Sequence, residues 1–214
     1  MIAVNGLKFI LPAMALTIIL ALWSAGKDSL PILIIAGLGA ILALFLTFFY
    51  RNPLRNIPTE GGLILSIADG RVLSVEDIDN DYIGGRGKKV SIFLSVFDVH
   101  INRVPVSGRV DYVKYNPGKF WAAFKAEASK ENEQTEIGLA FEHGRLIYKQ
   151  IVGVLARRIV CHLQKDQTVN AGEIFGMIHF GSRAELYLPD NVEVTTKVGD
   201  RVKAGESIIG RIRD

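Results

Sequence analysis

The sequence predicts a β-rich domain that follows an N-terminal hairpin of two transmembrane helices. Two observations carry this prediction. The chain begins with two long apolar runs, and from Pro53 onward it breaks into short alternating runs separated by Gly, Asn and Asp. A chain of 214 residues has room for one compact domain plus such an appendage. We therefore expect a membrane anchor over residues 1–52 and a β-rich domain over residues 53–214.

The apolar runs extend from Phe9 to Ala25 and from Leu30 to Tyr50. The first is interrupted only by Thr17 and Ser24, and the second carries no charged residue. A helix needs about 20 apolar residues, within a range of roughly 17 to 25, to cross the hydrocarbon core of a bilayer. The short polar link between the runs predicts a tight hairpin whose ends return to the same side of the membrane.

Two other interpretations of these runs stay open. The first run, with Lys8 before it and Ser24-Ala-Gly26 at its end, has features of a signal peptide, and both runs together fit a buried core hairpin. A second long run so close behind the first favours an anchor. Because Lys8, Arg51 and Arg55 flank the hairpin, the positive-inside tendency places both ends, and the β-rich domain, at the cytoplasmic face of the cell membrane.

The soluble part contains candidate strands with alternating apolar residues bounded by turn formers. Phe120 to Lys130 is the one good helix candidate, with an irregular loop as the alternative. Gly84-Gly-Arg-Gly87 lacks a strand-turn-helix setting, which indicates a hairpin loop and not a phosphate-binding loop. This pattern is typical of a β-rich domain with long connections. The candidate strands are residues 63–67, 71–75, 89–94, 108–113, 137–141, 146–151, 156–160 and 184–188.

Two segments of the domain are alike, Asp166-Gln-Thr-Val-Asn-Ala-Gly-Glu173 and Asp200-Arg-Val-Lys-Ala-Gly-Glu206. Each places a Val-x-Ala-Gly-Glu turn before an apolar run and a Gly. The pattern is similar to the hammerhead half-repeats of biotinyl and lipoyl carriers, and it predicts a barrel-sandwich hybrid. A carrier needs a modifiable lysine at a hairpin tip in a Met-Lys-Met or Asp-Lys-Ala setting. The turns hold Asn170-Ala171 and Lys203-Ala204 instead, which argues against a carrier.

Charge and cysteine content exclude several classes of protein. The net charge is only +3, which gives no reason to expect a nucleic-acid partner. The single cysteine, Cys161, excludes an intramolecular disulfide and fits a reducing compartment. No Cys/His spacing of a metal site is present, so we expect no metal. Basic residues that can attract an anionic leaflet cluster at Arg51 and Arg55, at Arg86, Lys88 and Lys89, and at Arg157 and Arg158.

The pair Gly181-Ser182 lies between two β-like runs. An inert hairpin turn is one interpretation, because Gly-Ser is a common turn signal. The other is self-cleavage. Gly181 has no side chain to block its own carbonyl, and a strained backbone with a nearby base would let the Ser182 hydroxyl convert the amide into an ester. Elimination and hydrolysis would then leave a pyruvoyl group at the head of a new C-terminal chain.

Several short sequence motifs along the chain resemble those of the phosphatidylserine decarboxylases in their short prokaryotic, membrane-anchored form. The resemblance is collinear over nearly the whole chain. It departs at His179, where Arg or Lys is expected, at Gln134, where Arg is usual, and at Val96, which replaces a frequent Pro. The matching words are Phe49-Tyr-Arg-Asn-Pro53, Ala68-Asp-Gly-Arg-Val72, Phe97-Asp-Val-His-Ile-Asn-Arg-Val-Pro105, Tyr115-Asn-Pro-Gly-Lys-Phe120, Gln150-Ile-Val-Gly153, Ala156-Arg-Arg-Ile-Val160 and the segment from Phe175 to Pro189.

The resemblance implies a lyase that is made as a zymogen and matures by autocatalytic cleavage between Gly181 and Ser182. Ser182 would become the covalent pyruvoyl cofactor, and His100 matches the essential histidine of the family. A base needs a third group to hold it. The resemblance favours Asp69 for this role, so that the triad is Asp69–His100–Ser182, and Asp98, two residues from His100 on the same strand face, is the local alternative.

The implied reaction is decarboxylation of phosphatidylserine to phosphatidylethanolamine, with the pyruvoyl ketone taking up the electrons released as CO₂ leaves. The expected partners are a serine phospholipid, the membrane, the fragment pair 1–181 and 182–214, and a second copy in a possible homodimer. Phe97, Phe120 and Trp121 can contact lipid chains or belong to the core. The sequence does not distinguish a diacyl lipid from an archaeal ether lipid. The alternative function is a membrane-tethered biotinyl-like adaptor without catalysis.

Overall fold

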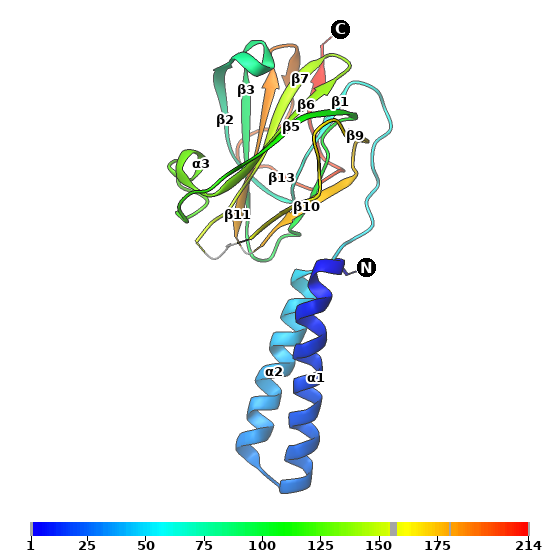
Figure 1. Cartoon of the computed structure of the whole chain (residues 1–214), viewed down its shortest axis with the longest axis vertical. Helices are drawn as coiled ribbons and strands as arrows, with labels where there is room; N and C mark the ends of the chain where they lie inside the picture. Colours follow the sequence, from blue (N-terminus) through cyan, green and yellow to red (C-terminus); the bar gives the residue numbers. More distant parts are fainter. Residues whose placement is uncertain (1, 155–157, 180, 214) are drawn as a thin grey trace. The chain divides into compact units, whose positions relative to one another are not determined.

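The computed structural model describes residues 2–154, 158–179 and 181–213. The chain divides into two compact units, Met1–Leu54 and Arg55–Asp214. The first unit is helical and the second is rich in strands (Figure 1).

The first unit is an antiparallel pair of helices, α1 (Val4–Lys27) and α2 (Leu30–Phe49). Asp28 ends α1 in the left-handed conformation, with a φ of 47°, and its N–H donates to the carbonyl of Ser24. At the other end of the pair, the Ala3 N–H donates to the Tyr50 carbonyl over 2.8 Å. Both helices are long and apolar enough to cross a membrane. The predicted helical hairpin is confirmed.

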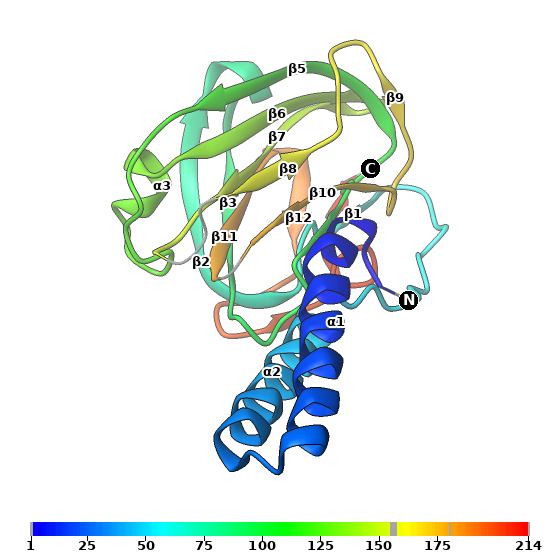
Figure 2. The same cartoon turned by 60° about the horizontal axis from the view of Figure 1, so that its bottom comes forward.

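The second unit consists of antiparallel sheets. The largest has eight strands in the order β13–β2–β3–β11–β7–β6–β5–β9, and two smaller ones have the orders β1–β14–β12 and β4–β10–β8. Figure 2 shows that the large sheet is strongly curled. The strands are β1 (Leu63–Leu65), β2 (Gly70–Asn80), β3 (Gly85–Leu94), β4 (Ile101–Arg103), β5 (Gly108–Asn116), β6 (Gln134–Phe141), β7 (Gly144–Ile151), β8 (Ile159–Cys161), β9 (Thr168–Val169), β10 (Ile174–Ile178), β11 (Ser182–Pro189), β12 (Val192–Val194), β13 (Arg201–Val202) and β14 (Ile208–Ile212).

Seven of the eight predicted strands are confirmed, and they lie in β1, β2, β3, β5, β6, β7 and β11. The eighth, 156–160, begins outside the described residues, and β8 (Ile159–Cys161) overlaps its end. The hairpin between β2 and β3 turns through a short 3₁₀ helix, η1 (Asp81–Ile83). The helix predicted over residues 120–130 is wrong, because only α3 (Ala128–Glu131) is helical there. The preceding residues form an irregular loop, in agreement with the alternative prediction for this segment.

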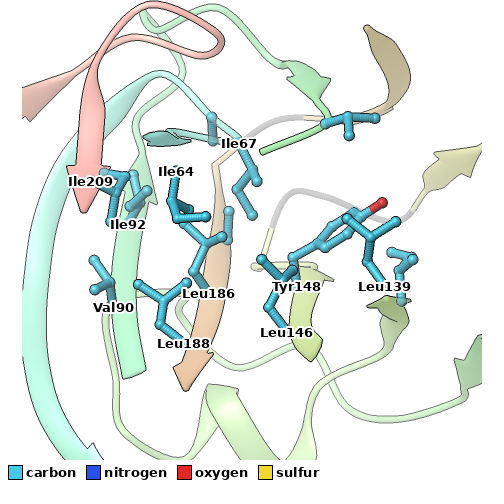
Figure 3. Packing of buried hydrophobic residues seen from close by; sticks show 14 of the residues in the cluster. Ile64, Ile67, Val90, Ile92, Leu139, Leu146, Tyr148, Leu186, Leu188 and Ile209 are labelled. Carbon is cyan, nitrogen blue, oxygen red and sulfur yellow. The ribbon is translucent and has the colours of Figure 1, made fainter. Parts of the chain in front are cut away.

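The core lies on the inner face of the large sheet (Figure 3). Every second residue of β3 (Val90, Ile92 and Leu94) and of β11 (Ala184, Leu186 and Leu188) is fully buried there. Burying a side chain of this size stabilises a fold by about 1.5–3 kcal/mol. Because β3 and β11 come from opposite sides of the Gly181-Ser182 bond, the core joins the two segments that cleavage would separate.

The two half-repeats form equivalent turns. Gly172 and Gly205 have left-handed φ values of 78° and 74°. The Gly172 N–H donates to the Val104 carbonyl and the Gly205 N–H donates to the Ser66 carbonyl, each over 2.8 Å. A Cβ added to Gly205 would lie 3.6 Å from the Gly172 Cα, so the two turns are neighbours. This pairing agrees with the predicted barrel-sandwich architecture.

Candidate active site

The Gly181-Ser182 bond lies at the start of β11. Ser182 pairs in register with Leu94 of β3 and is fully buried. Its hydroxyl has no hydrogen-bond partner within the described part of the chain. A buried hydroxyl without a partner is uncommon in folded proteins and calls for an explanation, of which a catalytic role is one. The cleavage site that the sequence predicts therefore contains a hydroxyl that no hydrogen bond within the described residues holds.

Two glycines shape this bond for different reasons. Gly181 has a φ of +63°, a conformation that residues with a side chain rarely adopt. Space is not its constraint, because the nearest atom to an added Cβ would be Val96 Cγ1 at 4.0 Å. Gly153 is the opposite case, since a Cβ there would collide with the carbonyl oxygen of Gly181 and lie 3.2 Å from Ala123 Cβ. The bare Cα of Gly153 thus makes room for the scissile carbonyl.

His100 is fully buried beside the bond. Its Nε2 lies 3.3 Å from the Gly181 nitrogen, and its Nδ1 lies 2.9 Å from the carbonyl oxygen of Asp98. Because Nδ1 faces a carbonyl oxygen and Nε2 faces an N–H, this arrangement places the ring proton on Nδ1 and leaves Nε2 as the acceptor. The imidazole therefore presents its basic nitrogen to the segment that contains the bond.

Asp98 acts on His100 through its backbone. The carboxylate of Asp98 accepts hydrogen bonds from the N–H and the hydroxyl of Ser95, over 2.8 and 2.7 Å, and closes the turn between them. It also lies 3.5 Å from Arg201. The turn fixes the Asp98 carbonyl, which in turn orients the imidazole.

Asp69 is held by other partners. Both of its oxygens lie 2.8 Å from the Arg55 guanidinium, and one accepts a hydrogen bond from the Ala204 N–H over 2.9 Å. Burial raises the pKa of the Asp69 carboxyl, and Arg55 and the Ala204 N–H offset part of that rise. The structure thus places His100 next to the Gly181-Ser182 bond. Asp69 instead contacts Ala204, which lies on the C-terminal side of that bond in the sequence. The role of Asp69 in orienting His100 stays a prediction.

The remaining histidines lie in other settings. His143 is exposed in the hairpin between β6 and β7, at the end of β7 away from Ser182. The N–H of His162 donates to the Phe175 carbonyl over 2.8 Å, as part of the sheet. His179 is buried just after β10, and its N–H donates to the Arg158 carbonyl over 3.2 Å.

A buried ion pair, not anticipated from the sequence, follows the bond on the outer face of β11. Arg183 and Glu185 are 2.7 Å apart and almost fully buried. Arg183 donates to the Ser91 hydroxyl over 2.7 Å, and the Tyr187 hydroxyl donates to Glu185 over 3.0 Å. The alternation of Arg, Glu and Tyr after Ser182 was the only signal in the sequence, and it does not show that the outer face is covered.

An apolar pocket of about 290 Å³ opens beside Gly181. Apolar pockets of this kind, with a few convergent polar groups, are typical ligand sites. Of the described lining residues, Ser95 is the one with a polar side chain. The lining residues are Phe93, Ser95, Val96, Phe97, Ala122, Ala123, Phe124, Val154 and Gly181.

Metal and thiol chemistry have little support in this part of the molecule. Among residues 2–154, 158–179 and 181–213, no group of three or more His, Cys, Asp or Glu side chains is placed to hold a metal ion. Cys161 packs against the core, and burial raises the pKa of its thiol. A thiol with a raised pKa is a poor nucleophile.

A family model described as phosphatidylserine decarboxylase matches residues 42–210. The chain belongs to this family. A phosphatidylserine decarboxylase proenzyme from Symbiobacterium thermophilum is 44% identical over 99% of this chain and 95% of its own length. Another from Pelobacter propionicus is 42% identical over 99% of this chain and 96% of its own length. A third, from Carboxydothermus hydrogenoformans, is 47% identical over 81% of this chain and 82% of its own length. The predicted family is confirmed, and family membership does not favour the adaptor alternative.

Proposed function

We propose that this chain is a membrane-anchored phosphatidylserine decarboxylase that cleaves itself between Gly181 and Ser182 and carries a pyruvoyl group at residue 182. Membership of the family, and relatives named as proenzymes, support the reaction and the processing. The observation that carries the choice of residues is the position of His100. Its Nε2 lies 3.3 Å from the nitrogen of Gly181, next to the buried Ser182 hydroxyl.

Self-cleavage would use this chain and water. The Ser182 hydroxyl adds to the Gly181 carbonyl carbon, the C–N bond breaks, and an ester and a free amine replace the amide. A base then removes the Cα proton of residue 182, and the Cβ–Oγ bond breaks to release Gly181 as a carboxylate. Water hydrolyses the enamine that remains, ammonia leaves, and residue 182 ends as a pyruvoyl group.

His100 is our candidate for the base. In the resting structure its Nε2 contacts the Gly181 N–H, so it must shift toward the Ser182 hydroxyl before the attack. Catalytic hydrogen bonds are often longer in resting structures than in reacting ones. The Asp98 carbonyl on Nδ1 stabilises the imidazolium that forms when Nε2 takes a proton. Asp69 stays in the proposal as the predicted carboxylate of the site.

The site fits a pyruvoyl group at residue 182, because the side chain there is buried, has no hydrogen-bond partner among the described residues, and is next to the pocket residue Gly181. When formed, the group supplies a ketone that binds the substrate amine and accepts the electrons released with CO₂. His100 would return a proton to the substrate Cα. The apolar pocket beside Gly181 would hold the lipid part of the substrate and exclude water from the reacting atoms.

The fragments 1–181 and 182–214 would stay together after cleavage. Strand β11 pairs with β3 and β7, β14 pairs with β1, and β13 pairs with β2, so every one of these ladders joins the two fragments. The apolar helices α1 and α2 support anchoring in the cell membrane, with the cytoplasmic face inferred from Lys8, Arg51 and Arg55. A homodimer remains a prediction.

The intact mass of the purified chain tests this proposal. Two pieces are expected for the wild type, ending at Gly181 and beginning with a pyruvoyl-blocked residue 182, together with CO₂ release from phosphatidylserine. Ser182→Ala should stay whole and inactive. Ser74→Ala, which removes another serine hydroxyl from the same sheet, is the matched control and should be cleaved like the wild type. A folded wild-type chain that stays whole would overturn the self-processing claim.

A further inference from the structure

A set of exposed apolar side chains lies in or next to the segments that line the pocket beside Gly181, since Phe120 and Trp121 directly precede the lining residues Ala122 and Ala123. We call it the aromatic rim, and it consists of Phe97, Phe120, Trp121, Phe124 and Val154. Their exposed fractions run from 40% for Phe120 to 67% for Phe97. Phe97, Phe124 and Val154 also line the pocket. Exposed apolar residues that gather in one place mark a surface that contacts something other than water.

Buried polar groups hold the loop that carries most of the rim. The side chain of Asn132, 1% exposed, accepts a hydrogen bond from the Trp121 N–H and donates to the carbonyls of Trp121 and Val152, each over 2.8 Å. Arg183 donates to the Lys125 carbonyl over 3.3 Å. The rings of Phe93 and Phe124 meet edge to face at 6.1 Å. The loop is therefore built to present its aromatic side chains outward.

Trp121 has the surroundings of a side chain at a membrane interface. Its indole N–H donates to Glu131 over 3.0 Å, and the amino groups of Lys119 and Lys125 lie 5.8 and 5.7 Å from the ring centre. Tryptophan with neighbouring lysines is typical of the boundary between lipid chains and head groups. Residues 116–134 contain three Lys and three Glu, so the attraction of this segment to a membrane would be apolar and not electrostatic.

We propose that the aromatic rim inserts into the surface of the bilayer and forms a membrane contact separate from α1 and α2. This inference rests on the proposed function, because a substrate that lies in the bilayer must reach the pocket beside Gly181. With the rim inserted, the pocket mouth opens directly to lipid, and the substrate enters without crossing water. An aromatic ring placed at the interface adds contact area there without burying a charge.

The fluorescence of Trp121 tests the proposal in the full chain. The chain has two tryptophans, Trp23 in α1 and Trp121, so Trp23→Phe leaves Trp121 as the single reporter. The variant also carries Ser182→Ala, and it is reconstituted in phosphatidylcholine vesicles brominated along the acyl chains. We expect the bromines to remove most of the Trp121 emission, with no change when the salt concentration is raised. This measurement needs neither cleavage nor decarboxylation, so it can fail while the proposed function holds, and the reverse.

A matched control places the reporter elsewhere on the same unit. His143→Trp, in a chain with Trp23→Phe, Trp121→Phe and Ser182→Ala, lies at the opposite end of β7 and should escape the bromines. Equal quenching of both reporters, or none at Trp121, would overturn the proposal. Quenching of Trp121 emission by a spin-labelled second copy, with no bromine effect, would assign the rim to self-association instead.

Activity gives a second readout. The double change Phe120→Ser and Trp121→Ser, at two rim residues that are not among the described residues lining the pocket, should lower kcat/KM severalfold for phosphatidylserine in vesicles and should leave cleavage at Gly181-Ser182 intact. The loss should be much smaller for a short-chain phosphatidylserine that dissolves in water. An equal loss on both substrates would contradict membrane insertion, because it would show that the two rings affect the reaction itself and not the contact with lipid.

Discussion

The two sides of the Gly181-Ser182 bond differ in how firmly the fold holds them. Downstream, β11 pairs with β3 from Ser182↔Leu94 to Pro189↔Gly87 and with β7 from Arg183↔Ile151 to Tyr187↔Ile147. Upstream, β10 makes only short ladders with β4 and β8 and ends at Ile178, and Gly181 adopts a left-handed conformation beside a pocket.

This difference suggests how one site can serve two reactions. After cleavage, the new head of the chain at residue 182 would stay fixed in the centre of the large sheet. The new carboxylate at Gly181 would be free to withdraw from the pocket that it lines. The rigid side then keeps the reactive group in place, and the loosely held side makes room for the substrate.

Of the changes considered, replacing His100 should have the largest effect on the rate of cleavage of the Gly181-Ser182 bond. We expect His100→Ala to slow self-cleavage by about 10²–10⁴-fold, the usual contribution of a positioned general base. The measurement is the rate at which the two fragments appear by intact mass. His143→Ala removes an exposed histidine from the other end of β7 and should change nothing. Cleavage of His100→Ala at the wild-type rate would show that another group activates Ser182.

Gly153 tests the space around the scissile carbonyl. Gly153→Ala places a methyl group against the Gly181 oxygen, so the scissile carbonyl must move from the position it holds in the wild type. We expect cleavage to slow by at least about tenfold, which corresponds to about 1.4 kcal/mol in the barrier. Gly61→Ala, which adds the same methyl group where it meets no atom of the described residues within 4 Å, is the control. Decarboxylation per mature site should be unchanged, because the carbonyl has by then become a separate carboxylate, and an equal loss in both reactions would contradict this role.

Breaking the Arg183–Glu185 ion pair on β11 tests how firmly the fold holds the chain after the Gly181-Ser182 bond. Glu185→Gln leaves Arg183 buried beside a neutral partner, and breaking a buried pair in this way costs about 3–5 kcal/mol of stability. Thermal unfolding of the Ser182→Ala chain in detergent measures the loss. Asp77→Asn breaks the exposed pair with Lys88 and should cost about 1 kcal/mol or less. Similar shifts for the two variants would show that the buried pair does not hold β11.

The sequence predicted six of the eight strands of the large sheet and the helical hairpin, because apolar alternation and uninterrupted apolar runs are local properties, and it missed the two-residue strands β9 and β13. It also predicted Gly181, Ser182 and His100 as one site, because the motifs around these residues resemble those of the family. It did not predict that Gly153 faces the Gly181 carbonyl, since that contact depends on how β7 and β11 align. The loop before α3 was also misjudged as helix, because the Asn132 side chain that binds the backbone of Trp121 is a tertiary contact.

The smallest expected effect is the pH dependence of stability that arises from Asp69, whose carboxylate accepts a hydrogen bond from Ala204 in the C-terminal fragment. Burial raises the pKa of Asp69, so the folded chain holds that proton more tightly than the unfolded chain does. The resulting stability is present below the ordinary pKa and is lost as the pH rises through the raised value. In the Ser182→Ala background, we therefore expect the melting temperature of the chain with Asp69 to fall relative to that of Asp69→Asn as the pH rises above about 4, the ordinary pKa of an aspartate. Glu76 is the matched control, because its hydrogen bond with Lys89 lowers its pKa and both partners lie upstream of the bond. Its contribution has the opposite sign, so the wild-type residue should gain stability relative to Glu76→Gln as the pH rises toward the ordinary glutamate pKa of about 4.3, and should keep that gain above it. Parallel trends for the two pairs of proteins would show that burial does not dominate the titration of Asp69, and that Arg55 and the Ala204 N–H keep its carboxylate charged where the two fragments meet.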